Sequence, residues 1–189
     1  MGHALSDSPL FLNREMGTVP TSSYQVRVTK DFLVFSSGHF ITYLGDQCEP
    51  IHGHNYRVTV EVEDELDANH YVIDFIALKD WTLEILKELD HRMLLPTKSS
   101  LILLSDDGPN VRATYRNRYW SFPREECALL PIANTTAELL ASYIADRLRS
   151  SIAAHGLSTP QMIRVEVEEC FGQSARYQWR RDADSPPLM

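Results

Sequence analysis

Two histidines separated by a single glycine, His52 and His54, have the type and spacing expected of a metal site. The residues that follow them alternate between apolar and polar up to Val62, as in a strand with one buried face. Side chains two positions apart in a strand lie on the same face, so both imidazoles continue the line of buried valines. Such a pair supplies half of a zinc site, and His39 upstream is the best candidate for a third ligand.

Three histidine ligands would leave the fourth position of a tetrahedral zinc ion open, as is typical of catalytic sites. Cys48, just before the histidine pair, is compatible with two roles. It is either a fourth ligand, or a thiol whose pKa the nearby positive charge lowers so that it acts as a base. The alternative without a metal is that the histidines are core residues hydrogen-bonded to backbone. Two histidines so close together, beside a cysteine, disfavour that alternative.

A second pair of polar residues, Asp90 and His91, stands at the end of a predicted helix. Apolar residues at helical spacing predict this helix from about Phe75 to Leu89, with Asp74 as its N-cap. A histidine at a helix C-terminus is favoured by the helix dipole by roughly 0.3–1 kcal/mol, which alone explains its position. The functional alternative is that Asp90 orients His91 for proton exchange with a substrate or with Cys48, provided that the helix ends there.

Glu169 is a further candidate because it interrupts an apolar face. Val165 and Val167 share its parity in a strand predicted near the C-terminus. A carboxylate on such a face is costly unless it meets a cation or several hydrogen-bond donors. Glu169 therefore either has such a partner, or is returned to water by a bulge or by the end of the strand.

The remaining patterns place these candidates among strands and helices. Alternation from Tyr24 predicts a first strand, and the last part of the chain predicts two strands joined by a turn at Gly172. Thr135 and Glu138 form a capping box, which predicts a second helix that continues until Gly156.

The segment between the two helices predicts an extra hairpin around 99–124. Its turn signal, Asp-Asp-Gly-Pro-Asn, separates two stretches with strand character. Within it Arg112, Arg116 and Arg118 share one parity and would form a basic stripe. Such a stripe is usually a solvated strand face. The alternative is a surface that holds phosphates or a partner subunit.

Length and composition fit one domain with a sizeable core, since 43% of the 189 residues are hydrophobic. We expect a loosely ordered lead-in over 1–22, the domain over 23–180 and a frayed tail over 181–189. The net charge of −8 disfavours nucleic acid and anionic membranes as partners. No apolar run approaches the roughly 20 residues that span a bilayer. An N-terminus without a secretory pattern and an odd number of cysteines predict a cytoplasmic location with free thiols.

Together the motifs resemble one known family. They are, in order, FSSGHF, Cys-x-x-x-His-Gly-His-Asn-Tyr, VIDFIALK, Leu-Asp-His, a Thr-x-Glu helix start and Val-Glu-Glu-Cys. This combination, over about residues 24–180, is similar to the 6-pyruvoyltetrahydropterin synthase / 6-carboxytetrahydropterin synthase family. The resemblance implies the tunnelling fold (T-fold), an α+β fold whose four-stranded antiparallel sheet carries two helices on one face. It also implies a homo-oligomer, typically a hexamer of two trimers with active sites between subunits.

The resemblance further implies a role for each candidate residue. The zinc ligands would be His39, His52 and His54, the proton-transfer residues Cys48, Asp90 and His91, and the pterin-binding residues Glu169 and Thr136. Zinc (Zn2+) would bind the side-chain hydroxyls of 7,8-dihydroneopterin triphosphate and make them more acidic. The glutamate would accept two hydrogen bonds from the guanidine-like edge of the pterin, which would explain a carboxylate on an apolar face.

The motifs differ in the product they indicate. The three-residue gap between Cys48 and His52 resembles the 6-carboxytetrahydropterin synthases of the 7-deazaguanine (queuosine) pathway. Glu49 instead resembles a bacterial subgroup that also releases 6-hydroxymethyldihydropterin for folate synthesis. A 6-pyruvoyl product of the biopterin type is a third alternative. An assembly protein that binds zinc and a pterin without turnover is an alternative of another class. The joint presence of the cysteine, the Asp-His pair and the C-terminal glutamate argues against it.

Overall fold

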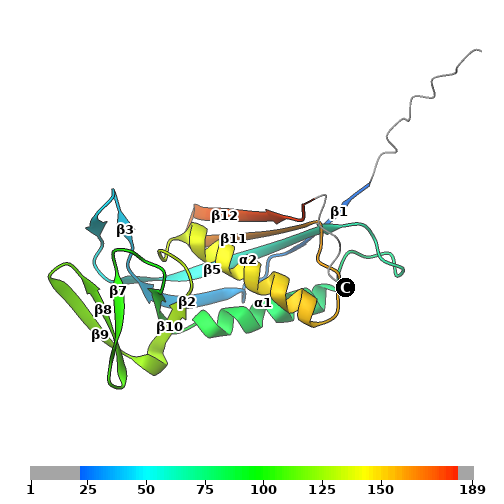
Figure 1. Ribbon diagram of the computed structural model, residues 1–189. Coiled ribbons are helices and arrows are strands. Elements are labelled where there is room, and N and C mark those ends of the chain that lie inside the picture. The colour runs from blue at the N-terminus through cyan, green and yellow to red at the C-terminus, as the bar shows by residue number, and fades with distance from the viewer. Residues whose placement is uncertain (1–21, 183–189) are drawn as a thin grey trace, which may run out of the picture.

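A computed structural model describes residues 22–182 and shows an α+β arrangement (Figure 1). The helices are α1 (Phe75–Leu89), α2 (Ala137–Ala154) and the short 3-10 helix η1 (Arg124–Glu126). The strands are β1 (Tyr24–Val28), β2 (Val34–His39), β3 (Thr42–Tyr43), β4 (Gln47–Cys48), β5 (His52–Asp64), β6 (Arg92–Pro96), β7 (Leu103–Asp107), β8 (Asn110–Tyr115), β9 (Arg118–Pro123), β10 (Cys127–Leu130), β11 (Met162–Cys170) and β12 (Gln173–Arg180). The predicted lead-in and tail lie almost entirely outside the described residues.

The main sheet is organised around β5, its longest strand. β1 and β2 pair one after the other along one edge of β5, β11 pairs along the other edge, and β12 pairs with β11, all antiparallel. This confirms the predicted four-stranded antiparallel sheet, with β1 and β2 together filling one strand position. Two strands that were not predicted, β6 and β10, continue the sheet beyond β2 in parallel pairing, giving seven strands.

Both long helices cover one face of this sheet, with α2 across β11 and β12 and α1 beside it (Figure 1). The even-numbered residues of β5 from Tyr56 to Val62 are buried beneath them, as the alternation predicts. α1 has the predicted limits, and the Asp74 carboxylate accepts a hydrogen bond from the Ile76 backbone N–H. The sheet and the helices therefore share one apolar core, and the histidines of β2 and β5 lie at its edge.

The predicted capping box of α2 is wrong by one residue. The N-cap is Thr136, whose hydroxyl accepts from the Leu139 backbone N–H. Thr135 is instead fully buried, and its hydroxyl donates to the Phe40 carbonyl oxygen. Since this bond ties Thr135 to the chain beyond β2, the helix begins one residue later than the local pattern predicts, and Glu138 is not at the third helical position.

The extra hairpin is also larger than predicted. β7, β8 and β9 form a three-stranded antiparallel sheet, because a second tight turn follows β8 at Arg116, whose φ is 54°. As a result Arg112 lies in β8, Arg116 in the turn and Arg118 in β9. The prediction of a single basic stripe along one strand is therefore wrong. The insert packs on the end of the main sheet through a second apolar cluster made of Phe40, Leu95, Ile102, Val111 and Ala113. Cys48 and Trp120 pack against that cluster, so the insert lies beside the cysteine.

Gly53 and Gly38 lie opposite each other where β5 pairs with β2. A Cβ atom at Gly53 would lie 2.9 Å from the Ser37 carbonyl oxygen, whereas one at Gly38 would meet the flexible end of Met93 at 3.2 Å. We therefore expect Gly53→Ala to lower the free energy of unfolding by about 1–3 kcal/mol, because backbone must move. Gly38→Ala should cost less. Urea unfolding measures both, and equal effects would contradict this explanation for the glycine between the histidines.

Candidate functional site

Three histidine side chains converge at one end of the apolar core. The register of β2 against β5 pairs His39 with His52 and Ser37 with His54, so the three rings lie on one face. The Nε2 atoms of His39 and His52 are 3.1 Å apart, and one ligand atom from each of the three residues lies within 4.8 Å of the others. His39 is buried, His54 is partly buried and His52 is exposed. The structure thus brings together the three residues that were predicted as metal ligands.

Hydrogen bonds from the far side of two rings determine which nitrogens are free. Nδ1 of His39 lies 2.9 Å from the Thr135 carbonyl oxygen, and Nδ1 of His52 lies 3.0 Å from that of Pro50. A carbonyl oxygen can only accept, so Nδ1 carries the proton in each ring and Nε2 keeps a lone pair. Burial lowers the pKa of His39, which favours this neutral form.

This donor set fits a metal ion. Two lone pairs that face each other at 3.1 Å repel, and a cation bound to both removes the repulsion. Imidazoles oriented through Nδ1–H bonds to backbone carbonyls are typical of zinc and other transition-metal sites. The residues whose carbonyls orient the rings were missed in the sequence, because Thr135 is 96 positions from His39 and carries no side-chain signal for this contact.

Cys48 and Glu49 lie beside the cluster in different ways. An oxygen of the Glu49 carboxylate is 3.9 Å from Nε2 of His52. Cys48, in β4, is not among the described residues that group around a metal position. Its thiol donates weakly to the Glu49 carbonyl oxygen, and its own carbonyl accepts from the Arg118 guanidinium at 3.0 Å. In this conformation Cys48 precedes Glu49, which reaches His52, but it is not itself among the grouped ligand candidates, so the alternative of a fourth ligand gains no support.

Arg118 belongs to the insert and holds the backbone at Cys48 in place. Its guanidinium lies 5.1 Å from the centre of the Tyr115 ring and 5.3 Å from that of Trp120, so two cation–π contacts fix it in place. Burial raises the pKa of the Cys48 thiol, and the positive charge of Arg118 opposes that rise.

We therefore expect Arg118→Gln to slow alkylation of Cys48 by iodoacetamide at neutral pH and to move the midpoint of its pH profile upward. The reason is that the thiolate loses the charge that stabilises it. Mass spectrometry of the labelled peptide measures this rate for Cys48 alone. Arg112→Gln is the matched control, since Arg112 lies on the same insert and pairs with Asp107. An unchanged pH profile for Arg118→Gln would contradict this role.

Asp90 and His91 have the geometry that the functional interpretation requires. α1 ends at Leu89, Asp90 is extended, and His91 has a left-handed backbone with φ of 56°, which is unusual for a residue other than glycine. An oxygen of the Asp90 carboxylate lies 2.9 Å from Nδ1 of His91, and the other accepts from the Ser36 backbone N–H at 2.7 Å. Although partial burial opposes ionisation, these bonds hold the pKa of Asp90 below its usual value. The carboxylate thus orients a histidine whose side chain is 82% exposed.

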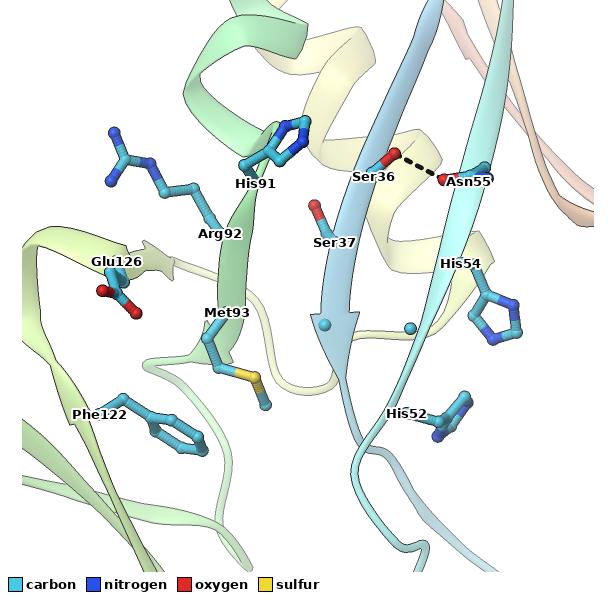
Figure 2. A pocket seen from close by; sticks show the side chains of 12 residues that line it. Ser36, Ser37, His52, His54, Asn55, His91, Arg92, Met93, Phe122 and Glu126 are labelled. Atoms are coloured by element: carbon cyan, nitrogen blue, oxygen red, sulfur yellow. Dashed lines mark hydrogen bonds between the residues drawn. The ribbon is translucent and has the colours of Figure 1, made fainter.

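A groove of about 550 Å³ separates this pair from the metal-ligand candidates. It is lined by Ser36, Asn55, His91, Arg92, Phe122 and Glu126 among others, and it reaches His52 and His54. Figure 2 shows His91 and Arg92 on the β6 side of β2, whereas His52 and His54 project from β5 on the side away from it. Among residues 22–182 no hydrogen bond joins Cys48 to His91. The structure therefore joins Asp90 to His91 but does not bring Cys48 to this pair within one chain.

Glu169 faces the histidine cluster. One carboxylate oxygen lies 3.4 Å from Nε2 of His39 and 3.6 Å from Nε2 of His54. Tyr56, which the alternation marks only as a core residue, stands edge-on to both rings, with centres 5.7 Å and 5.5 Å away. Thr136 caps α2 directly after Thr135, whose carbonyl orients His39. The predicted carboxylate is thus close to the metal-ligand candidates, a proximity that parity alone did not predict.

The fold and the histidine cluster define a tunnelling-fold protein with the donor set of a metal centre. Residues 27–180 match the model of the family described as 6-pyruvoyl tetrahydropterin synthase. The chain belongs to this family of pterin enzymes, which confirms the resemblance seen in the sequence. Neither long helix within residues 22–182 has the length and apolar character needed to cross a membrane.

Relatives within the family carry different names. A Methanocaldococcus jannaschii protein provisionally named 6-carboxy-5,6,7,8-tetrahydropterin synthase is 36% identical over 146 residues, which are 77% of this chain and 89% of that protein. A Pyrococcus furiosus protein named dihydroneopterin monophosphate aldolase is 38% identical over 60 residues, or 32% of this chain and 50% of that protein. The chain is therefore similar to proteins with two different named activities.

A solved structure of Plasmodium vivax 6-pyruvoyltetrahydropterin synthase has the same fold. It superposes with a TM-score of 0.78 at 28% identity, over 85% of this chain and 100% of that one. That structure is described as a mutant in which a catalytic glutamate is replaced by alanine.

Proposed function

We propose that the protein is a zinc enzyme that converts 7,8-dihydroneopterin triphosphate to 6-carboxy-5,6,7,8-tetrahydropterin in 7-deazaguanine synthesis. The observation that carries the proposal is the convergence of the three imidazoles, two of them oriented by backbone carbonyls. The M. jannaschii relative, which the chain matches over most of both lengths, supports the 6-carboxy product.

Each candidate residue has a task in this reaction. His39, His52 and His54 would hold zinc, which when bound makes the side-chain hydroxyls of the substrate more acidic. Cys48, which precedes Glu49 in the chain, moves protons of that side chain as it is cleaved and acetaldehyde leaves. Asp90 orients His91 as the second proton carrier. Glu169 binds the guanidine-like edge of the pterin, and Thr136 helps to bind the ring.

The two proton carriers meet only if subunits assemble. His91 is exposed and makes no hydrogen bond with Cys48 among the described residues. We infer that Cys48 of one copy works with His91 of another, in a hexamer made of two trimers. Among residues 22–182 the outer strands of the main sheet, β10 and β12, each have one edge without a strand partner, which such assembly could use.

Release of 6-hydroxymethyldihydropterin is the second candidate function, favoured by the 3.9 Å distance between Glu49 and His52. The P. furiosus relative, which is named an aldolase, supports this candidate. We expect Glu49→Gln to reduce any 6-hydroxymethyl product by about 10²–10⁴-fold, the range for a general acid or base, and to spare the 6-carboxy product. Chromatography of both products tests this. Glu126→Gln, in the nearby groove, is the control, and an equal loss of both products would contradict a separate role for Glu49.

The proposal is tested by stripping the protein with a chelator and restoring zinc. Triphosphate release from 7,8-dihydroneopterin triphosphate should vanish on stripping and return with zinc. A 6-pyruvoyl product would also release triphosphate but no acetaldehyde, so a coupled acetaldehyde assay separates the two. A pterin-binding assembly protein would bind the substrate with and without zinc and would release neither triphosphate nor acetaldehyde. That result would overturn the proposal.

A further inference from the structure

Glu169 occupies an irregular position in the main sheet. The pairing of β11 with β12 shifts register between Glu168 and Cys170, so Glu169 is the extra residue of a β-bulge. A bulge was one of the two sequence alternatives and was expected to return the carboxylate to water. Instead the carboxylate faces His39 and His54 at the bulge, and its side chain is 28% exposed.

The distances around this carboxylate are those of a coordination shell. Four ligand atoms bound tetrahedrally at about 2.0–2.1 Å from a zinc ion lie about 3.3–3.4 Å from one another. Here the Glu169 oxygen is 3.4 Å from Nε2 of His39 and 3.6 Å from Nε2 of His54. Nε2 of His39 and Nε2 of His52 are 3.1 Å apart. The Glu49 carboxylate contacts only one of the histidines, at 3.9 Å, and fits the shell less well.

The surroundings of Glu169 also call for a cation. Among residues 22–182 its carboxylate forms ion-pair contacts only with His39 and His54, and no arginine or lysine approaches it. A carboxylate beside the Nε2 lone pair of a neutral His39 is unfavourable unless a positive ion binds both.

We propose that Glu169 is a fourth protein ligand of the metal before the pterin binds, and that the pterin then withdraws it. The inference rests on the proposed function, since the same carboxylate would bind the guanidine-like edge of the pterin. The two tasks follow one another. Without a pterin, the Glu169 carboxylate occupies the fourth coordination position of the metal. When a pterin binds the carboxylate, that position becomes free for the hydroxyls of the pterin's side chain. The metal would therefore have a free coordination position only when the pterin is bound.

Cobalt(II) substitution tests this without measuring turnover. The visible spectrum of the cobalt protein reports the number and kind of ligands, so Glu169→Gln should change it and should weaken cobalt binding about tenfold or more. Glu168→Gln is the matched control, because Glu168 is the adjacent residue but accepts from the Gly172 backbone N–H. It should change neither quantity. Circular dichroism of both variants checks that they fold.

A second arm uses 6-methylpterin, which has no side-chain hydroxyls to bind the metal. Adding it to the wild-type cobalt protein should change the spectrum toward that of Glu169→Gln, and adding it to Glu169→Gln should change nothing. Identical spectra and affinities for the wild type and the Glu169 variant would overturn the inference while leaving the metal site intact. A wild-type protein that binds no cobalt or zinc would overturn the inference and the proposed function together.

Discussion

Replacing His39 with alanine is expected to abolish metal binding and turnover. His39 is 1% exposed, and its ring is oriented by the Thr135 carbonyl oxygen, so the substitution removes the most buried and best oriented of the ligand candidates. Loss of a hydrogen-bond partner behind a metal ligand already costs roughly 10–100-fold in affinity, and loss of the ligand itself should cost more. Zinc content after dialysis, measured by atomic absorption, shows the effect directly.

His70→Asn is the control for that experiment. His70 is exposed in a turn with φ of 65°, a left-handed conformation that asparagine tolerates. It should retain full zinc content. Equal zinc content in the wild type and in His39→Ala would show that the histidine cluster is not the metal site.

Replacing Cys48 with alanine is expected to lower turnover by about 10²–10⁴-fold, the usual contribution of a positioned proton carrier. Zinc content should not change, because the cysteine lies outside the group of three histidines. Steady-state rates of triphosphate release together with metal analysis separate the two effects.

Cys127→Ala is a matched control, since Cys127 is also partly buried and packs against the same apolar cluster as Cys48. It should keep wild-type turnover. If Cys48→Ala turned over at the wild-type rate, the thiol would have no part in proton transfer. If it lost zinc, Cys48 would be a ligand in the assembled enzyme.

Features set by local periodicity were predictable from the sequence. Parity along one strand is sufficient to place His52 and His54 on the buried face, because a strand alternates strictly. The limits of α1 were also predictable, because its apolar stripe begins after the Asp74 cap and stops at Leu89. The pairing of Asp90 with His91 requires the helix to end before them, and the structure shows that it ends at Leu89.

Features set by contacts distant in the chain were not predictable. The cap of α2 moved to Thr136 because Thr135 bonds to Phe40, 95 positions away. The parallel strands β6 and β10 are short, and their sequences show no alternation of apolar and polar residues that marks them as strands. A tight turn at Arg116 divides the insert into three strands. The distance of Glu169 from the histidines follows from the pairing of β11 with β5, which are distant in the chain.

The most direct test of the proposed chemistry is to incubate the zinc-loaded protein with 7,8-dihydroneopterin triphosphate and to identify the products by mass. The predicted result is 6-carboxytetrahydropterin with an equal amount of acetaldehyde. A 6-hydroxymethyl or 6-pyruvoyl product would keep the metal site and the family but contradict the proposed product. Bound pterin without any turnover would contradict the enzymatic function itself.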